Sequence, residues 1–420
     1  MKNFVITILA AFAVLFCIVY ACSSYASGKT YKTSEIEVKK ISGSWVSCKK
    51  GTNTKVDYTG VAKNEYGWWR VYKGQVDFTA NGIYQNDYGW WKTTNGKVTF
   101  DETGIYQNEH GWWRTEDSKV NFQANSIYQN IHGWWKTTNG KVTFKDHGIY
   151  QNEHGWWKVE DSKVNFNYNG LASNEHGTWV IVNGKVDFSY SGLFTFRGVT
   201  YSIDGGKVQK VISQCNKNML FLGDSISSGY MLHGDKVNNV SESYPIKASK
   251  LLNCNITSFA RAGESYYKRP NEFCIAEYFQ NNDVYKYDVV IIDAGINDYF
   301  SNHSMSNMNE ALDVICSKLN SANQRRLSSG KSPMIVIIYK IGFVFNHGDN
   351  SLGYSIADYN SKISSIIDAN LNMEHYILTS GVLNSKTYQS YTVDNIHPNQ
   401  KGVQNQTIAF IEDLYRLKIA

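Results

Sequence analysis

The C-terminal half of the chain alternates short apolar runs with longer segments of mixed character. Runs of three to six residues rich in Val, Ile, Leu and Phe predict buried strands, and the segments between them are long enough for crossover helices. Alternation of this kind predicts an α/β fold, built as a three-layer, doubly wound and mostly parallel sheet. The predicted strands are residues 219–222, 256–259, 289–294, 334–339 and 376–378.

The N-terminal half has a different pattern, which repeats with a period of 22 residues. Each unit holds two short aromatic and β-branched runs separated by turn residues, which predicts a β-hairpin. One hairpin cannot bury its aromatic side chains alone, so neighbouring hairpins must stack into an all-β hairpin-repeat solenoid. The glycine that opens each motif stands at Gly67, Gly89, Gly111, Gly133, Gly155 and Gly177.

Most repeats carry two adjacent tryptophans, which point to opposite faces of a strand. The outer motifs, at Trp45 and Trp179, keep only the second tryptophan. We therefore expect the second tryptophan of each pair to lie in the core. The first either packs between hairpins or forms an aromatic groove that stacks on sugar rings. These glycan-binding candidates are Trp68, Trp90, Trp112, Trp134 and Trp156.

A histidine recurs at one position of the repeat, just before the motif glycine. A metal role is not predicted, because Tyr66 and Tyr88 occupy the same position and a zinc site needs several converging ligands. We expect this position to hold a flat, partly polar ring, and we expect neither a metal site nor a cofactor in the chain. The histidines are His110, His132, His154 and His176.

The first residues of the chain have the pattern of an export signal. Lys2 precedes an apolar run over residues 4–21, and small residues follow it as far as Gly28. Cleavage after Ala26 fits this pattern and places the mature protein outside the cytoplasm or on the cell surface. Two alternatives stay open, namely lipid attachment at Cys22 and an uncleaved anchor, because 18 apolar residues reach the lower limit for crossing a bilayer.

Composition supports two domains. All 12 tryptophans lie between Trp45 and Trp179, and a chain of 420 residues has room for two cores. We expect a signal segment over residues 1–26, a repeat domain over 41–211 and an α/β domain over 216–420. The net charge of +5 is small and its basic residues are interleaved with acidic ones, which excludes a nucleic-acid partner.

Cysteine use adds little to this organisation. Cleavage after Ala26 leaves five scattered cysteines without metal-like spacing. They do not form a disulfide framework, although a single bridge stays open.

Polar motifs follow three of the predicted strands, and a fourth motif lies near the C-terminus. Residues 223–225 read Gly-Asp-Ser, 260–265 Ala-Arg-Ala-Gly-Glu-Ser, 293–298 Asp-Ala-Gly-Ile-Asn-Asp, and 394–398 Asp-Asn-Ile-His-Pro. Ligands of doubly wound sheets bind beyond the carboxyl ends of the strands. Together the four blocks resemble those of the SGNH (GDSL-type) hydrolase family, over about residues 216–420.

The resemblance implies a serine esterase. Ser225 is then the nucleophile, His397 its general base, and Asp394 the carboxylate that orients the imidazole. The oxyanion hole comprises the backbone N–H groups of Ser225 and Gly263 and the side-chain amide of Asn297. Asp224 and Asp298 belong to the same motifs, and for these we expect structural hydrogen bonds rather than chemistry.

The repeats resemble the cell-wall and glucan-binding repeats of Gram-positive surface proteins, a group that includes choline-binding repeats. The resemblance covers about residues 41–211 and rests on the Gly-Trp step and the Gly-Lys-Val turn. The second strand reads Lys97-Val98-Thr99-Phe100 where choline-binding repeats carry an aromatic cluster. The expected partner is therefore a cell-wall polymer or another polysaccharide rather than choline.

The two resemblances together predict a surface esterase that removes acetyl or other short acyl groups from a plant or cell-wall glycan. Two other functions are compatible with the same observations. A lipase or lysophospholipase has the same catalytic residues and differs in the shape of its acyl pocket. A non-catalytic surface adhesin would use the repeats alone, and it does not need an intact set of catalytic residues.

Overall fold

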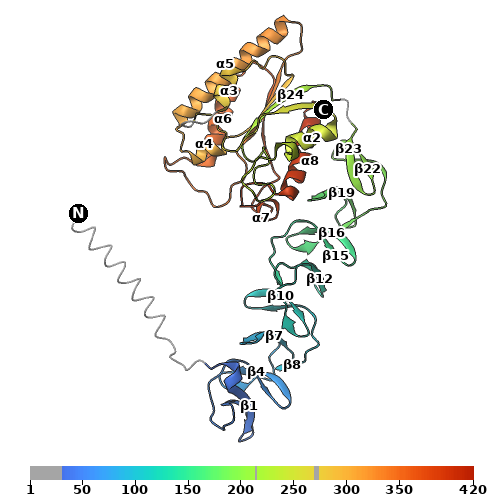
Figure 1. Cartoon of the computed structure of the whole chain (residues 1–420), viewed down its shortest axis with the longest axis vertical. Helices are drawn as coiled ribbons and strands as arrows, with labels where there is room; N and C mark the ends of the chain where they lie inside the picture. The colour runs from blue at the N-terminus through green and yellow to red at the C-terminus, as the bar shows by residue number, and fades with distance from the viewer. Residues whose placement is uncertain (1–30, 213–214, 269–273) are drawn as a thin grey trace, which may run out of the picture. The chain divides into compact units, whose positions relative to one another are not determined.

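The computed structural model describes residues 31–212, 215–268 and 274–420, so the predicted signal over residues 1–26 lies outside the described residues. The chain divides into two compact units, one ending in the repeats near residue 142 and one comprising residues 133–136 and 143–420 (Figure 1). Among the helices that the structure describes, none combines the length and apolar character needed to cross a bilayer.

The first unit consists of antiparallel strands and one short 3-10 helix, η1. All its strands except β12, which joins a third sheet, form two sheets, in the orders β1-β2-β5-β4-β3 and β14-β10-β11-β7-β6, with β8 added to β4 and β9 to β10. The elements are η1 Thr33–Glu35, β1 Ile36–Ile41, β2 Ser44–Lys49, β3 Gly60–Asn64, β4 Gly67–Tyr72, β5 Gln75–Val76, β6 Gly82–Asn86, β7 Gly89–Thr93, β8 Lys97–Val98, β9 Gly104–Asn108, β10 Gly111–Glu116, β11 Lys119–Val120, β12 Ile127–Asn130 and β14 Lys141–Val142.

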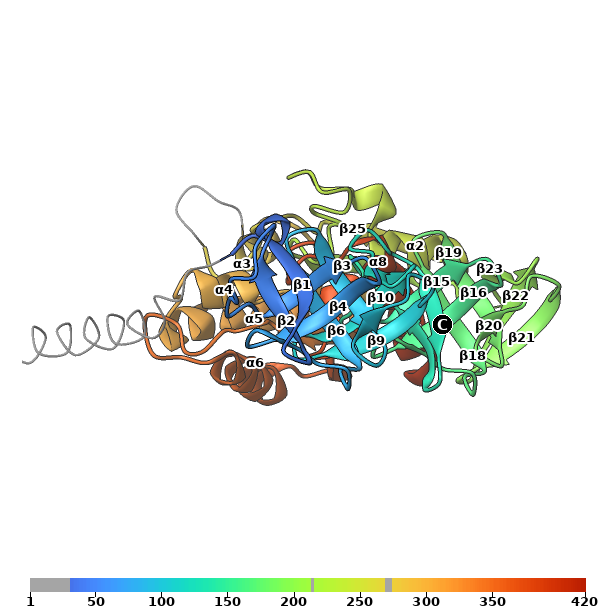
Figure 2. The ribbon, with the colours of Figure 1, turned by 90° about the horizontal axis from the view of Figure 1, so that it is seen from below.

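The second unit begins with further strands of the same repeat, and β18 to β23 lie side by side (Figure 2). These strands are β13 Gly133–Lys136, β15 Gly148–Asn152, β16 Gly155–Glu160, β17 Lys163–Val164, β18 Gly170–Asn174, β19 Gly177–Val182, β20 Lys185–Val186, β21 Gly192–Phe196, β22 Val199–Asp204 and β23 Lys207–Val211. The motif at Gly177 is therefore not the last hairpin, because β21 and β22 form another one.

Each repeat contains the predicted hairpin, and an asparagine at its turn fixes the second tryptophan. In the hairpin of β6 and β7, Asn86 pairs with Gly89 across the turn. The Asn86 Oδ1 atom accepts hydrogen bonds from the Tyr88 backbone N–H at 2.9 Å and from the Trp91 Nε1–H at 2.9 Å. The same asparagine-to-tryptophan bond forms at Asn64–Trp69, Asn108–Trp113, Asn152–Trp157 and Asn174–Trp179.

A lysine from the following repeat covers both the motif glycine and the second tryptophan. Lys119 pairs with Trp91 across β11 and β7, and its Nζ atom lies 5.2 Å from the Trp91 ring centre. A Cβ at Gly89, whose φ is +139°, would lie only 2.8 Å from the Lys119 Cε atom. Glycine is thus required both by its backbone conformation and by this lysine. Equivalent lysines are Lys97, Lys141, Lys163, Lys185 and Lys207.

The burial of the two tryptophans confirms that the second one belongs to the core in all pairs but the first. Trp113 is 9% exposed and Trp91 8%, whereas Trp69 and the first tryptophan of each pair are half-buried. The Trp90 ring lies 5.0 Å from Trp113 and 5.4 Å from His110 of the following repeat. The recurring histidine therefore packs against an aromatic ring. This agrees with the expectation, based on Tyr66 and Tyr88, that the position holds a flat ring.

The α/β region contains a five-stranded parallel sheet in the order β25-β24-β26-β27-β28. All five predicted strands are present, and the order is that of a flavodoxin-like doubly wound fold. The elements are β24 Asn218–Gly223, η2 Val240–Glu242, α2 Tyr244–Leu252, β25 Asn255–Ser258, α3 Ile275–Asn281, β26 Val289–Asp293, α4 Ile296–Phe300, α5 Met305–Ser328, β27 Ile335–Lys340, α6 Ile356–Asn370, β28 His375–Thr379, α7 Tyr388–Tyr391 and α8 Gln400–Arg416.

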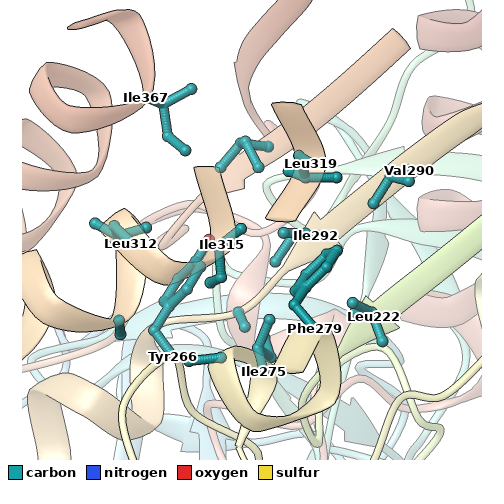
Figure 3. Packing of buried hydrophobic residues seen from close by; sticks show 14 of the residues in the cluster. Leu222, Tyr266, Ile275, Phe279, Val290, Ile292, Leu312, Ile315, Leu319 and Ile367 are labelled. Carbon is teal, nitrogen blue, oxygen red and sulfur yellow. The ribbon is translucent and has the colours of Figure 1, made fainter. Parts of the chain in front are cut away.

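Successive residues of the central strands enter two different cores. Leu220 and Leu222 of β24 face a cluster formed with α3, α5 and α6, part of which Figure 3 shows. Met219 and Phe221 face the other cluster, formed with α2 and α8. The inner strands β24, β26 and β27 are buried on both faces and have continuous apolar sequences, which is why they could be predicted, whereas the edge strands β25 and β28 are only partly buried.

The last hairpins of the repeat array share the second of these cores. Val199, Tyr201 and Ile203 of β22 are buried in the same cluster as Met219 and Phe221. Strands β18 and β19 also contact α8. Residues from about 170 onward therefore form one packed body with the α/β region.

Candidate active site

Ser225 stands in a tight turn directly after β24. A Cβ at Gly223 would collide with the Ser227 Oγ atom, so the turn requires glycine at this position. The Asp224 Oδ1 atom accepts the Ile226 backbone N–H at 2.9 Å and closes the turn around the serine. Ser225 is held just beyond the carboxyl end of β24, an inner strand of the sheet, with only 6% of its surface exposed.

His397 is held by a second turn, just before α8. The Val393 backbone N–H donates to the His397 carbonyl at 2.8 Å, and Asn395 adopts a left-handed conformation with φ of 71°. Asn399 then caps α8 by accepting the Gly402 N–H at 3.0 Å. The helix cap and the turn together fix the backbone on which the imidazole stands.

The structure brings Ser225, His397 and Asp394 into one chain of hydrogen bonds. The His397 Nε2 atom lies 3.0 Å from the Ser225 Oγ atom, and the Nδ1 atom lies 2.7 Å from the Asp394 Oδ2 atom. An ionised carboxylate only accepts hydrogen bonds, so Nδ1 carries the proton and Nε2 is free to accept the serine proton. This arrangement can deprotonate a hydroxyl as it attacks an acyl carbon.

Asp394 is suited to remain ionised. Its burial alone would raise the pKa of this carboxyl, but hydrogen bonds from the His397 backbone and side chain outweigh burial and lower the pKa below its usual value. The Asp394 Oδ1 atom accepts the His397 N–H at 2.8 Å and the Ile396 N–H at 3.1 Å. A charged Asp394 stabilises the imidazolium that forms when His397 takes up a proton.

Gly263 and Asn297 come from neighbouring loops that are tied together. The Asn297 Nδ2 atom donates to the carbonyl of Glu264, the residue after Gly263, at 2.8 Å. This bond uses one of the two amide hydrogens and orients the other. Gly263 has a φ of +85°, a conformation that favours glycine.

Asn238 is a residue of the site that the sequence motifs did not predict. Its Oδ1 atom accepts the Ser228 Oγ–H at 2.7 Å and the Ala262 backbone N–H at 3.1 Å. It thereby joins the loop after Ser225 to the loop that carries Gly263. No sequence pattern marks this position, because it lies in a polar loop without periodicity.

Asp298 and Asp224 make the structural hydrogen bonds that were expected of them. Asp298 is fully buried and accepts the backbone N–H groups of Tyr266 and Tyr267 at 2.8 and 3.0 Å. Burial raises the pKa of Asp224 well above its usual value, and the neighbouring Asp293 adds to this effect. Burial also raises the pKa of Asp293 to about 6, although the Tyr244 hydroxyl donates to it at 2.6 Å.

A small apolar cavity lies behind the turn that carries Ser225. It has a volume of about 50 Å³, and its wall includes Asp224 and Ile226, the two chain neighbours of Ser225, but neither Ser225 nor His397. Ile296, the residue before Asn297, and Phe343 also contribute to the wall. By the same measure one water needs roughly 10–15 Å³, so the cavity has room for about four water-sized groups.

The first tryptophans of the repeats lie in the packing between hairpins. The first tryptophan of each pair keeps part of its ring at the surface, next to the ring that precedes the following motif glycine. Trp112 lies 5.6 Å from His132, and Trp134 lies 5.4 Å from His154. Within the described part of the chain, no group of three or more His, Cys, Asp and Glu side chains is arranged to hold a metal ion.

Two known families match the chain, one in each half. Residues 221–404 match the GDSL-like lipase/acylhydrolase family. The C-terminal half is a GDSL-like acylhydrolase domain. Residues 57–77, 101–121 and 167–187 match the choline-binding repeat, so the acylhydrolase domain follows repeats of the cell-wall-binding type.

Solved structures similar to the acylhydrolase domain include several esterases. A psychrotrophic esterase from Pseudoalteromonas is 15% identical, with a TM-score of 0.36 over 49% of this chain and 100% of that chain. A family two carbohydrate esterase from Clostridium thermocellum, in complex with cellohexaose, is 17% identical, with a TM-score of 0.35 over 51% and 69% of the two chains. A search of curated proteins gave no match.

Proposed function

We propose that the chain is an exported serine esterase that removes acetyl or similarly short acyl groups from a polysaccharide. The observation that carries this proposal is the hydrogen-bonded chain from Ser225 through His397 to Asp394. Because the domain is of the GDSL-like acylhydrolase family, we infer that these three residues act on an ester. In this proposal residues 1–26 direct export, 41–211 attach the protein to a glycan and 216–420 carry the chemistry.

The reaction proceeds through an acyl-enzyme. His397 takes the proton of the Ser225 hydroxyl while the Oγ atom attacks the acyl carbon, and Asp394 stabilises the resulting imidazolium. The tetrahedral oxyanion accepts hydrogen bonds from the Ser225 and Gly263 backbone N–H groups and from the free amide hydrogen of Asn297. The imidazolium of His397 then gives its proton to the sugar oxygen as the C–O bond breaks, so the sugar leaves as an alcohol. Water, deprotonated by the same histidine, attacks the acyl-enzyme and releases the acid and Ser225.

Attachment to a glycan is supported by the repeats. Their type is that of wall-binding repeats, and the first tryptophan of each pair keeps part of its ring exposed along the array. The Lys119 ammonium already lies over the Trp91 ring, the place where a choline headgroup would seek its cation–π contact. A neutral polysaccharide therefore suits the array better than choline does.

An ester chain-length series on the complete chain tests the proposal. We expect kcat/KM for p-nitrophenyl acetate to exceed that for the octanoate ester at least tenfold, and Ser225→Ala to lack both activities. A control, Ser241→Ala, alters an exposed serine and should turn over acetate normally. Preference for eight or more carbons would replace the acetylesterase with a lipase, and turnover that does not depend on Ser225 would refute both.

A further inference from the structure

The hairpin of β18 and β19 departs from the repeat consensus where it meets α8. Its Ala172 stands where other repeats have Tyr84, Tyr106, Tyr128 and Tyr150, and only the hairpin of β3 and β4 also has an alanine, Ala62, at the same position. Thr178 replaces the first tryptophan in the same hairpin. Both strands contact α8, so smaller side chains allow the helix to approach.

Docking of the helix does not account for all the space that these substitutions open. A cavity of about 420 Å³ remains between the hairpins and the acylhydrolase domain. Protein interiors are close-packed, and contacts formed only for stability rarely leave a space of this size. The volume lies within the range of small-molecule binding pockets.

The walls of the cavity carry aromatic rings from both sides. Tyr168 and Phe196 come from the repeats, and Tyr391 comes from α7 of the acylhydrolase domain. Ala172 and Thr178 also line the cavity, so the two departures from the consensus are part of its wall. Aromatic faces combined with polar groups are suited to stacking on sugar rings.

The charged groups of the cavity are paired with each other. The Arg197 Nη1 atom lies 3.2 Å from the Glu412 Oε2 atom, and the Lys158 Nζ atom lies 3.1 Å from the Glu160 Oε1 atom. Two cations and two anions balance, so the cavity does not select a charged ligand. A neutral ligand with many hydroxyl groups fits this arrangement.

One acceptor in this cavity lacks a donor. The Glu412 Oε1 atom is buried and accepts no hydrogen bond from any described residue. Because this oxygen has almost no accessible surface, a ligand hydroxyl can donate to it only when the Glu412 side chain turns toward the cavity.

We propose that this cavity is a second carbohydrate site, which binds one or two neutral sugar units of the polymer that carries the ester. The proposal rests on the proposed function for the identity of that polymer. Ala409 of α8 lines both this cavity and the small cavity behind the Ser225 turn, so one helix borders both. In this proposal the last hairpins of the array bind the polymer next to the acylhydrolase domain.

Calorimetric titration of the complete chain tests the site. The probes are xylohexaose, cellohexaose and hexa-N-acetylchitohexaose, each in wild type and in Ala172→Tyr, which restores the repeat consensus and fills the cavity. We expect one of the three probes to bind the wild type. The Ala172→Tyr variant should bind one molecule of that probe fewer per protein chain. Glu412→Gln, which leaves the volume unchanged, should weaken the same binding about tenfold even where the tyrosine variant does not fold.

Glu116→Gln is the matched control, because Glu116 pairs with Arg114 in another repeat at 3.5 Å. Equal stoichiometry and affinity in wild type and both cavity variants would overturn the proposal, as would the absence of binding by all three probes. Acetate turnover, measured in parallel, separates the two hypotheses. Sugar binding without Ser225-dependent turnover would refute the proposed function alone, whereas normal turnover without a cavity effect would refute the second site alone.

Discussion

The acylhydrolase domain and the repeat array distribute their important contacts in opposite ways. In the domain, Ser225, His397 and Asp394 are each used once and are joined in a single chain of hydrogen bonds. In the array, the lysine over the second tryptophan occurs six times, from Lys97 to Lys207. One substitution should therefore abolish the chemistry, whereas one substitution in the array should act locally.

The largest effect is expected at His397. In His397→Gln the serine loses its proton acceptor, so kcat for acetate ester hydrolysis should fall by at least about 10⁴-fold with the fold intact. His375→Gln is a matched control, because His375 also pairs with an aspartate, Asp368 at 3.1 Å, in the same domain. A kcat within tenfold of wild type for His397→Gln would show that the histidine is not the base.

A buried tryptophan of the array should matter for stability but not for turnover. Trp113 is 9% exposed and bonds to Asn108, so Trp113→Ala should destabilise its repeat by about 3–5 kcal/mol in urea unfolding. Acetate turnover should stay within twofold of wild type. A parallel loss of turnover would contradict the separation between the two regions.

The neighbouring Trp112 gives the matched comparison. It is only half-buried, so Trp112→Ala should cost less stability than Trp113→Ala. If the first tryptophan contacts glycan, Trp112→Ala should also reduce retention on insoluble cell-wall polysaccharide, measured by sedimentation. Unchanged retention with reduced stability would assign Trp112 to packing alone.

These contrasts also explain what could be predicted from the sequence. The inner parallel strands β24, β26 and β27 have continuous apolar runs, and the motifs after β24 and β26 place Ser225 and Asn297 on one rim. Asn238 could not be predicted, because it joins two loops whose approach is set by the tertiary fold. The contact of α8 with β18 and β19 was equally hidden, although Ala172 and Thr178 mark the place where the repeat changes.

A titration effect of intermediate size should arise at Asp293. Its pKa is raised by burial from an ordinary 3.8 to about 6, so the folded state holds this proton more tightly than the unfolded chain does. The free energy of unfolding should therefore fall as pH rises from about 4 to 6, by about 3 kcal/mol at 1.36 kcal/mol per pKa unit. Asp293→Asn should lack this part of the slope, and parallel curves for the two proteins would contradict the assignment.

The smallest effect is expected at Lys141 of the array. Its ammonium lies 5.2 Å from the Trp113 ring centre, and such cation–π contacts contribute about 0.5–1 kcal/mol at exposed sites. Lys141→Met keeps the alkyl chain over Gly111 and removes the charge, so the melting temperature should fall by only a few degrees. The same variant uncovers one Trp face, and calorimetry with choline should then detect weak binding that wild type lacks. If the wild type binds choline with equal affinity, the lysine does not block the ring. The array would then have the choline-binding function that the name of its repeat family suggests.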